Sequence, residues 1–237
     1  MKSLPPTPEA FALIADAGDR LLHGLDRLTD ADAAAPSRLG GWSRAHVLSH
    51  LSAQVDALER LLYWARTGTE TPQYADRRAR DAEIEEGSRQ SAAALVDRVR
   101  GSAARFLTTV RELPDPAWRT VVRPFTGELC TPERILVIRL RELEVHHTDL
   151  DLGYGFGDIP RAAADVLLDD VSGYLAGAAG TPPCTLRDDT GAPVAAFGSG
   201  GPVVTGSRGA LLGWLTGRSA GEGLTTPGPL PALPAWI

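Results

Sequence analysis

Three side chains in this sequence have the chemistry and the spacing of a metal site. Glu142 and His146 are four residues apart, so on a helix they project from one face, about 40° apart, on neighbouring turns. His50 lies at the edge of the apolar stripe of another predicted helix and points towards the core. Two histidines and one carboxylate are a familiar ligand set for a catalytic zinc ion, with a position left open for water or substrate. Spacing alone leaves open a solvated surface pair and a buried histidine without a metal.

The polar residues beside these three are weaker candidates. His46 lies further round its helix, towards the polar side. His147 is rotated by about 100° from His146 and cannot share its direction. Asp149 shares the face of Glu142, where it could accept a hydrogen bond from a ligand imidazole or simply end the helix.

These side chains must be positioned by helices, and the first two-thirds of the chain has the pattern of four. Apolar residues recur at helical spacing, and two segments have the threonine-then-proline sequence that begins a helix. We therefore expect an up-and-down bundle of four long helices. The predicted helices run from Thr7 to about Leu28, from Ser43 through Leu62, from about Asp76 to Leu113, and from Thr131 to about Leu150.

The helical pattern stops at residues 153–157, where three glycines occur in five positions. We place the domain boundary there, with a helical bundle in residues 1–152 and a small α+β domain in residues 158–237. The elements expected in the second domain are a helix over 160–178, a hairpin of strands 184–187 and 194–197, a strand at 203–205 and a helix over 207–216.

The composition argues against several classes of function. A net charge of -6 and a pI near 5.4 do not suit a nucleic-acid partner, which needs a basic face. No apolar run approaches the ~20 residues that span a membrane, and the first residues lack a signal peptide, so we expect a cytoplasmic protein. Cys130 and Cys184 show no CxxC motif, so we expect two ordinary thiols and no disulfide. No feature indicates an obligate protein partner.

Three segments resemble the signatures of a known family. GWSRAHVLSHL, residues 41–51, resembles the GWS…VLxHL signature of the DinB-like metal-binding helical bundles. RELEVHHTDL, residues 141–150, resembles the RExxVHxxDL signature of the mycothiol-dependent maleylpyruvate isomerases within that superfamily. GWLTGR, residues 213–218, is similar to the WLxGR element of their C-terminal domain. The segments occur in the family's order, so the resemblance covers nearly the whole chain.

This resemblance implies a fold, a metal and a catalytic residue. The fold would be an N-terminal DinB-like four-helix bundle followed by a small C-terminal α+β domain. The family's ligands map onto His50, Glu142 and His146, the same residues that helical spacing selects, and imply one zinc ion. The family's essential arginine maps onto Arg218, which could instead complement the dipole at the end of a helix.

The activity that the resemblance implies is that of a zinc- and mycothiol-dependent cis-trans isomerase. Such an enzyme converts maleylpyruvate, or a similar cis-dienoate, to fumarylpyruvate by reversible addition of the mycothiol thiolate. A nucleophile borrowed from a small thiol explains why no protein nucleophile stands out. The motifs also fit a mycothiol S-transferase, which would leave the sulfur on an electrophilic metabolite or toxin. A binding module without chemistry fits less well, because the candidate functional residues His50, Glu142, His146 and Arg218 are all intact. A zinc hydrolase fits less well, because no additional general base on an inward helix face is obvious.

Overall fold

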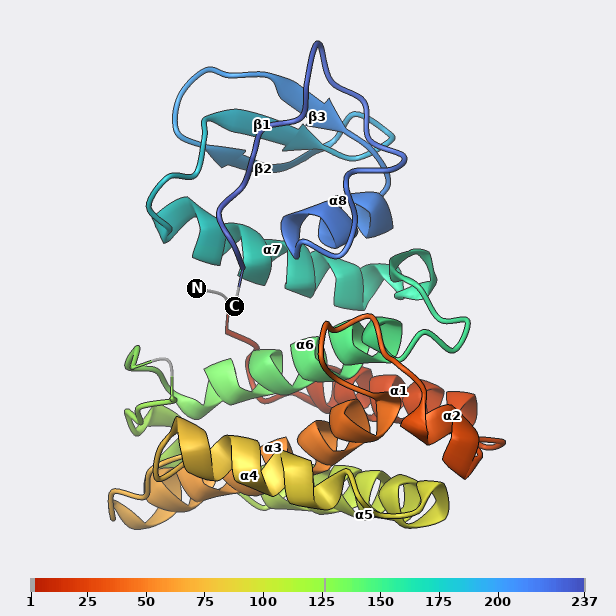
Figure 1. The fold of residues 1–237 in the computed structure, drawn as a ribbon. Coiled ribbons are helices and arrows are strands. Elements are labelled where there is room, and N and C mark those ends of the chain that lie inside the picture. The colour runs from red at the N-terminus through yellow and green to blue at the C-terminus, as the bar shows by residue number, and fades with distance from the viewer. Residues whose placement is uncertain (1–2, 126, 237) are drawn as a thin grey trace. The chain divides into compact units, whose positions relative to one another are not determined.

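The chain folds as two units that follow one another in the sequence. The computed structural model describes residues 3–125 and 127–236. One unit spans Ser3–Gly153, and the other begins at Tyr154 (Figure 1). The first is built from helices and the second combines helices with a small sheet. The predicted fold class, a helical bundle followed by a small α+β domain, is therefore confirmed.

Four long helices form the bundle of the first unit. Two of them begin where the sequence predicts, because Thr7 Oγ1 accepts a hydrogen bond from the Ala10 amide and Ser43 Oγ accepts one from the His46 amide. Most leucines of the predicted apolar stripes, among them Leu21, Leu48 and Leu140, are fully buried, and each such side chain stabilises the bundle by about 1.5–3 kcal/mol. The long helices are α1 (Pro8–Gly24), α3 (Arg44–Thr67), α5 (Ala92–Arg111) and α6 (Pro132–Asp149), and the shorter ones are α2 (Asp30–Ala34), α4 (Arg77–Gly87) and η1 (Ala117–Arg119).

The third predicted helix, from about Asp76 to Leu113, is wrong as a single helix. The structure divides it into α4 and α5, with residues 88–91 between them. Ser88 Oγ donates a hydrogen bond to the Glu85 carbonyl in the last turn of α4. Ser91 Oγ accepts a hydrogen bond from the Ala94 amide in the first turn of α5. One serine therefore satisfies the end of the first helix, and the other caps the beginning of the second.

The direction of the helices explains this break. Arg105 pairs with Asp56 and with Glu59, and Thr109 donates to Glu59, so α3 and α5 run parallel. Two successive parallel helices need a connection that travels back over the length of the first. α4 packs against α3 and makes this return (Figure 1).

The predicted up-and-down order is therefore wrong as well. The Leu4 amide bonds the Glu133 carbonyl before the first turn of α1, and Arg20 pairs with Glu144 near the ends of both helices, so α1 and α6 run parallel. Both α1 and α3 pack between α5 and α6. The bundle thus consists of two parallel pairs, α1 with α6 and α3 with α5, in opposite directions.

The second unit packs a three-stranded sheet with two helices. The strand β1 (Cys184–Arg187) pairs antiparallel with β2 (Pro193–Phe197) and parallel with β3 (Val203–Thr205), in the order β2-β1-β3. The helix α7 (Arg161–Gly177) contacts both β2 and α8 (Arg208–Leu215). All five elements predicted here are present, and the short helix η2 (Phe156–Asp158) was not predicted.

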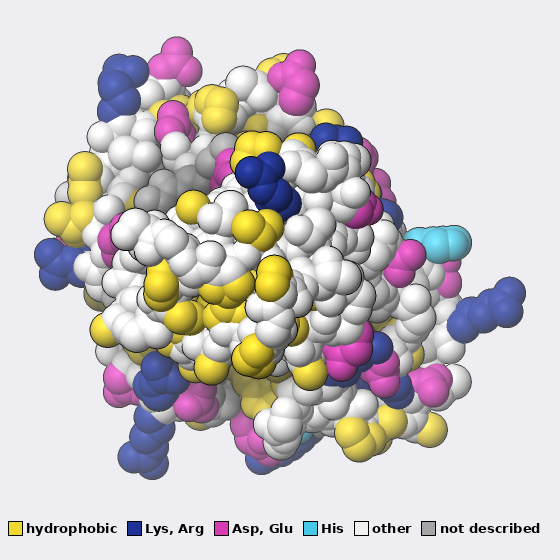
Figure 2. Space-filling model, turned by 90° about the horizontal axis from the view of Figure 1, so that it is seen from above, with side chains coloured by type: hydrophobic (Ala, Val, Ile, Leu, Met, Phe, Trp, Pro, Cys, Tyr) yellow, Lys and Arg dark blue, Asp and Glu magenta, His cyan; other side chains and the backbone are white. Residues whose placement is uncertain are grey.

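The surface shown in Figure 2 carries scattered charges of both signs. Lys and Arg side chains do not form a continuous basic area on this face. Within residues 3–125 and 127–236, no helix combines the length and the apolar character needed to cross a membrane.

The contact between α4 and α3 gives a test of this arrangement. A Cβ at Gly87 would lie 2.1 Å from Ser49 Oγ and 3.2 Å from Ser49 Cβ. We expect Gly87→Ala to lower the free energy of unfolding by about 1–3 kcal/mol, because overpacking forces the two helices to shift. Ser49→Ala should restore part of the loss, because it removes the oxygen that clashes. Urea unfolding of the wild type, both single variants and the double variant measures this coupling, and purely additive effects would contradict it.

Candidate metal centre

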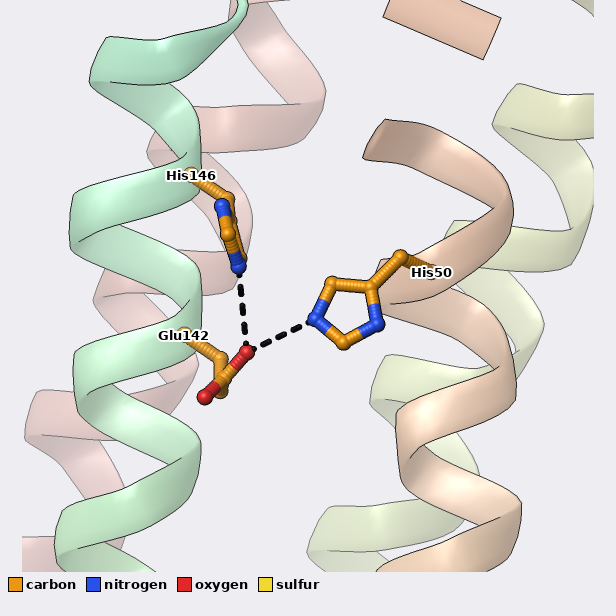
Figure 3. Close-up of side chains that lie close together, drawn as sticks. All are labelled: His50, Glu142 and His146. Carbon is orange, nitrogen blue, oxygen red and sulfur yellow. Dashed lines mark hydrogen bonds and ion pairs between the residues drawn. The ribbon is translucent and has the colours of Figure 1, made fainter. Parts of the chain in front are cut away.

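His50 on α3 meets Glu142 and His146 on α6 (Figure 3). His50 Nε2 lies 2.9 Å from Glu142 Oε2, and His146 Nε2 lies 3.2 Å from the same oxygen. The three side chains are 7%, 15% and 13% exposed. The structure therefore brings together the three residues that the sequence selected, with their donor atoms facing one point.

Two arginines fix the antiparallel register that makes this meeting possible. Arg44, in the first turn of α3, donates from Nε to the Leu150 carbonyl at 2.6 Å, just past the end of α6. Arg139, on α6, donates from Nη1 to the Leu51 carbonyl at 3.0 Å and to Gln54 Oε1 at 2.9 Å. These contacts lie on either side of the cluster along the helices. A slide of one helix past the other would break both.

His146 is oriented by Asp149, one turn further along α6. His146 Nδ1 lies 2.9 Å from Asp149 Oδ2, and the Asp149 side chain is fully buried. A carboxylate on Nδ1 keeps the proton on that nitrogen and leaves Nε2 as the ligand atom. Of the two possible roles of Asp149, the structure shows the hydrogen bond to the imidazole.

His50 is held by aromatic packing instead. Its ring lies 5.6 Å from the ring of Trp42, which precedes α3, and meets the ring of His146 edge-on at 4.9 Å. Its Nδ1 is buried and has no hydrogen-bond partner among the described residues. Burial, with a smaller contribution from His146, lowers the pKa of His50 against the opposing effect of Glu142. The ring is therefore neutral near pH 7, as a metal ligand must be.

The carboxylate between the two imidazoles is ionised. Burial by itself would raise the pKa of Glu142, but hydrogen bonds from His146 and His50 hold it well below 4.5. Burial likewise opposes the charged form of His146, yet Asp149 and Glu142 raise the pKa of this imidazole to about 9. Without a metal, His146 is thus an imidazolium between two carboxylates.

The donor set suits a divalent metal ion. Two imidazole nitrogens and one carboxylate oxygen lie within 4.8 Å of one another. A tetrahedral ion with bonds of about 2.0–2.2 Å fits between atoms so placed, since it holds its ligands roughly 3.3–3.6 Å apart. This cluster is the one group of three or more such donors in the described part of the chain.

The remaining histidines lie elsewhere, as the helical positions of His46 and His147 predicted. His46 Nδ1 lies 2.7 Å from the oxygen of Ser43, and its Nε2 lies 3.1 Å from Glu85 on α4. His147 faces the end of α1, where a Cβ at Gly24 would lie 3.0 Å from its Nε2. His23 is exposed and pairs with the neighbouring Asp26.

Arg218 belongs to the second unit, directly after α8. Gly217 adopts φ of 71°, and the Arg218 amide donates to the Gly213 carbonyl, which is the geometry of a Schellman helix end. The Arg218 side chain donates from Nη1 to the Thr216 carbonyl at 2.9 Å, and its guanidinium lies 5.3 Å from the ring of Trp236. The charge thus complements the helix dipole, and the backbone of Arg218 is fixed by the helix end.

Sequence reasoning missed the residues that fix the register of α3 and α6 around the cluster. Arg44 and Arg139 were not singled out. Arg44 carries a signal, because a basic residue in the first turn of a helix is unfavourable for the helix dipole and implies a partner elsewhere. Arg139 carries none, since a buried arginine cannot be told from an exposed one by spacing.

Comparison with known families finds a match to the model of the mycothiol maleylpyruvate isomerase N-terminal domain, over residues 14–151. That range includes all three residues of the cluster. Among curated proteins, the comparison finds no significant match.

Solved structures extend the similarity to the whole chain. A crystal structure of the mycothiol-dependent maleylpyruvate isomerase matches 100% of both chains at 30% identity with a TM-score of 0.89. A histidine-to-alanine mutant of that isomerase matches equally far at 30% identity with a TM-score of 0.88. YfiT from Bacillus subtilis, described as a probable metal-dependent hydrolase with an unusual four-helix bundle topology, matches 61% of this chain and 83% of its own at 18% identity and a TM-score of 0.52. The last likeness concerns the fold alone.

The cluster predicts one divalent ion per chain, with His50, Glu142 and His146 as its ligands. Each of His50→Ala, Glu142→Ala and His146→Ala should abolish binding, because three protein ligands cannot spare one. His46→Ala is the matched control and should keep the ion, because its ring faces Ser43 and Glu85. Elemental analysis of the purified proteins decides this. Retention of the ion by all three ligand variants would contradict the assignment.

The charge on His146 predicts that metal binding depends on pH. Below about pH 9 the metal-free His146 imidazole carries a proton that the ion must displace. Down to about pH 6.5, His50 is already neutral and Glu142 is already ionised, so neither of them adds to the pH dependence. Affinity should therefore rise about tenfold per pH unit from pH 6.5 to 9 and then level off. Titration calorimetry in buffers of different ionisation enthalpy should detect about one proton released per ion. An affinity that is constant between pH 7 and 9 would rule this out.

Proposed function

Because the chain belongs to the mycothiol maleylpyruvate isomerase family of enzymes, we propose that it is a zinc- and mycothiol-dependent cis-trans isomerase of maleylpyruvate or a similar cis-dienoate. The observation that carries this proposal is the cluster of His50, Glu142 and His146, in a chain whose whole length matches an isomerase of that kind. Its partners would be two small molecules, the thiol and the dienoate. Cytoplasmic location remains a prediction.

His50, Glu142 and His146 would hold the zinc ion. When bound there, zinc would favour the thiolate form of mycothiol at neutral pH, since a nearby cation stabilises the deprotonated sulfur. Asp149 keeps the His146 ring in the orientation that presents Nε2. Burial of the cluster limits the access of water, which strengthens each of these electrostatic contacts.

The reaction needs no oxidant and no protein nucleophile. The mycothiol thiolate adds to the activated double bond, and the electron pair of that bond moves into the conjugated ketone as an enolate. The former double bond is now single and rotates. Return of the electron pair expels the same thiolate and leaves the trans product. Burial raises the pKa of Cys130 to about 11 and also raises that of Cys184, so neither thiol of the protein competes as a nucleophile.

Arg218 is our proposed catalytic residue. Its planar guanidinium is charged at every relevant pH and suits a substrate carboxylate or the enolate that develops during addition. The Schellman helix end at Gly217 fixes the backbone from which it projects. Its Nη1 donates to the Thr216 carbonyl at 2.9 Å, which holds the side chain near the helix end.

The proposal is tested by incubating the metal-loaded protein with mycothiol and maleylpyruvate. We expect fumarylpyruvate to form only when both metal and thiol are present, with the thiol recovered unchanged by mass spectrometry. Accumulation of a stable thioether would identify an S-transferase instead. Absence of both products would overturn the proposal.

Replacement of Arg218 separates its proposed catalytic role from a purely structural one. Arg218→Ala should keep the metal ion and lose about 2–5 kcal/mol of transition-state stabilisation, the usual loss when a charged partner of a buried carboxylate is removed. Arg218→Lys should rescue only part of the rate, because lysine lacks the planar fork. Steady-state kinetics with elemental analysis checks both. Full activity of Arg218→Ala would show that the residue only ends a helix.

A further inference from the structure

A cationic side chain packs on the aromatic ring beside His50, and it comes from a helix to which the mechanism above assigns no role. Arg80 lies on α4, and its guanidinium carbon lies 6.0 Å from the centre of the Trp42 ring. The Trp42 ring lies 5.6 Å from the ring of His50. Arg80, Trp42 and His50 thus form a row of contacts that ends at the metal donors.

The present ion pair of Arg80 is weak enough to be exchanged. Its Nη1 lies 2.9 Å from the carboxylate of Asp81, the next residue, whose side chain is 56% exposed. Exposed pairs of this kind contribute little to stability. The Arg80 side chain itself is only 22% exposed. A mostly buried guanidinium that is paired with an exposed carboxylate can exchange that carboxylate for a better-placed anion.

Tyr74 adds a neutral donor to the same place. Its side chain is buried, and burial raises its pKa to about 12, with Arg80 opposing and Glu142 adding to the shift. Arg80 also contributes to the lowered pKa of His50. Arg80 therefore meets the cluster through the Trp42 ring, and the Tyr74 phenol lies beside its guanidinium.

The chemistry of thiol addition predicts which substrate group should lie near Arg80. A thiolate adds to the carbon that is β to the conjugated ketone, and in a maleyl group this carbon carries a carboxylate. The attacked carbon must lie near the thiol sulfur, so its carboxylate lies near the metal donors as well. An unpaired carboxylate in that position would repel the approaching thiolate.

We propose that Arg80 binds the carboxylate on the carbon that the thiolate attacks. This inference rests on the proposed function and adds to it a determinant of substrate specificity. Arg80 pairs with the anion, removes its repulsion of the thiolate, and selects substrates that carry a charge at this position.

The test compares Arg80→Gln with Arg78→Gln, which removes the same charge from an exposed position on the same helix. Arg80→Gln should lower kcat/KM for the dicarboxylate about 10- to 100-fold, chiefly through KM, as expected for the loss of a charged hydrogen bond. With the ester of that carboxylate as substrate, wild type and Arg80→Gln should differ by less than about threefold. Arg78→Gln should match the wild type, and Arg80→Lys should recover part of the loss. Metal content should be unchanged throughout.

A binding measurement gives a readout that does not depend on turnover. Maleate carries the same cis carboxylate but has no ketone, so it lacks the group on which the enolate would form. Calorimetry should show that Arg80→Gln weakens maleate binding to the metal-loaded protein about tenfold or more, while Arg78→Gln leaves it unchanged. If Arg80→Gln loses equal activity on the acid and on the ester, or binds maleate as tightly as the wild type does, the role of Arg80 is overturned and the proposed function is unaffected. A wild type that neither isomerises a cis-dienoate nor binds maleate overturns the proposed function and this inference together.

Discussion

Two arginines hold α3 and α6 in one antiparallel register, and the candidate metal site depends on that register. Arg44 satisfies carbonyls at the end of α6, and Arg139 reaches back from α6 to a carbonyl of α3. Charged hydrogen bonds of this kind are worth about 1.5–3 kcal/mol each, and a buried arginine that lost its acceptors would cost more. Other registers are therefore disfavoured by the same contacts that stabilise this one. His50 faces Glu142 and His146 as a consequence.

The same geometry determines the rest of the bundle. α3 must run antiparallel to α6 to present His50, and α5 runs parallel to α3 with its own ion pairs. A return segment is then unavoidable, and α4 supplies it. Because α4 travels back along α3, it carries Arg80 to Trp42 and places Gly87 against Ser49. A single continuous helix over residues 76–113 would have taken Arg80 away from the cluster.

Electrostatics within the cluster match the proposed chemistry. A carboxylate between two imidazoles stays ionised in spite of its burial, and the proton on His146 is the one that a metal ion must displace. The protein's own thiols have raised pKa values, so a small thiol can act as the nucleophile without competition. In the proposed mechanism, arginines bind the anionic groups of the substrate, because their charge persists in buried positions where a lysine would lose its proton.

The sequence by itself was sufficient for the parts that depend on local periodicity. Glu142 and His146 share a helix face because four residues make about one turn, and the caps at Thr7 and Ser43 begin helices because their side chains bond amides three residues on. The apolar stripe of the second predicted helix placed His50 towards the core, and the family signatures agreed with that choice. Only the tertiary structure decided the break in the third helix, the parallel pairing of α3 with α5, and the positions of Arg44, Arg80 and Arg139. These features depend on contacts between residues far apart in the chain, and spacing along one helix carries no information about its partner across the core.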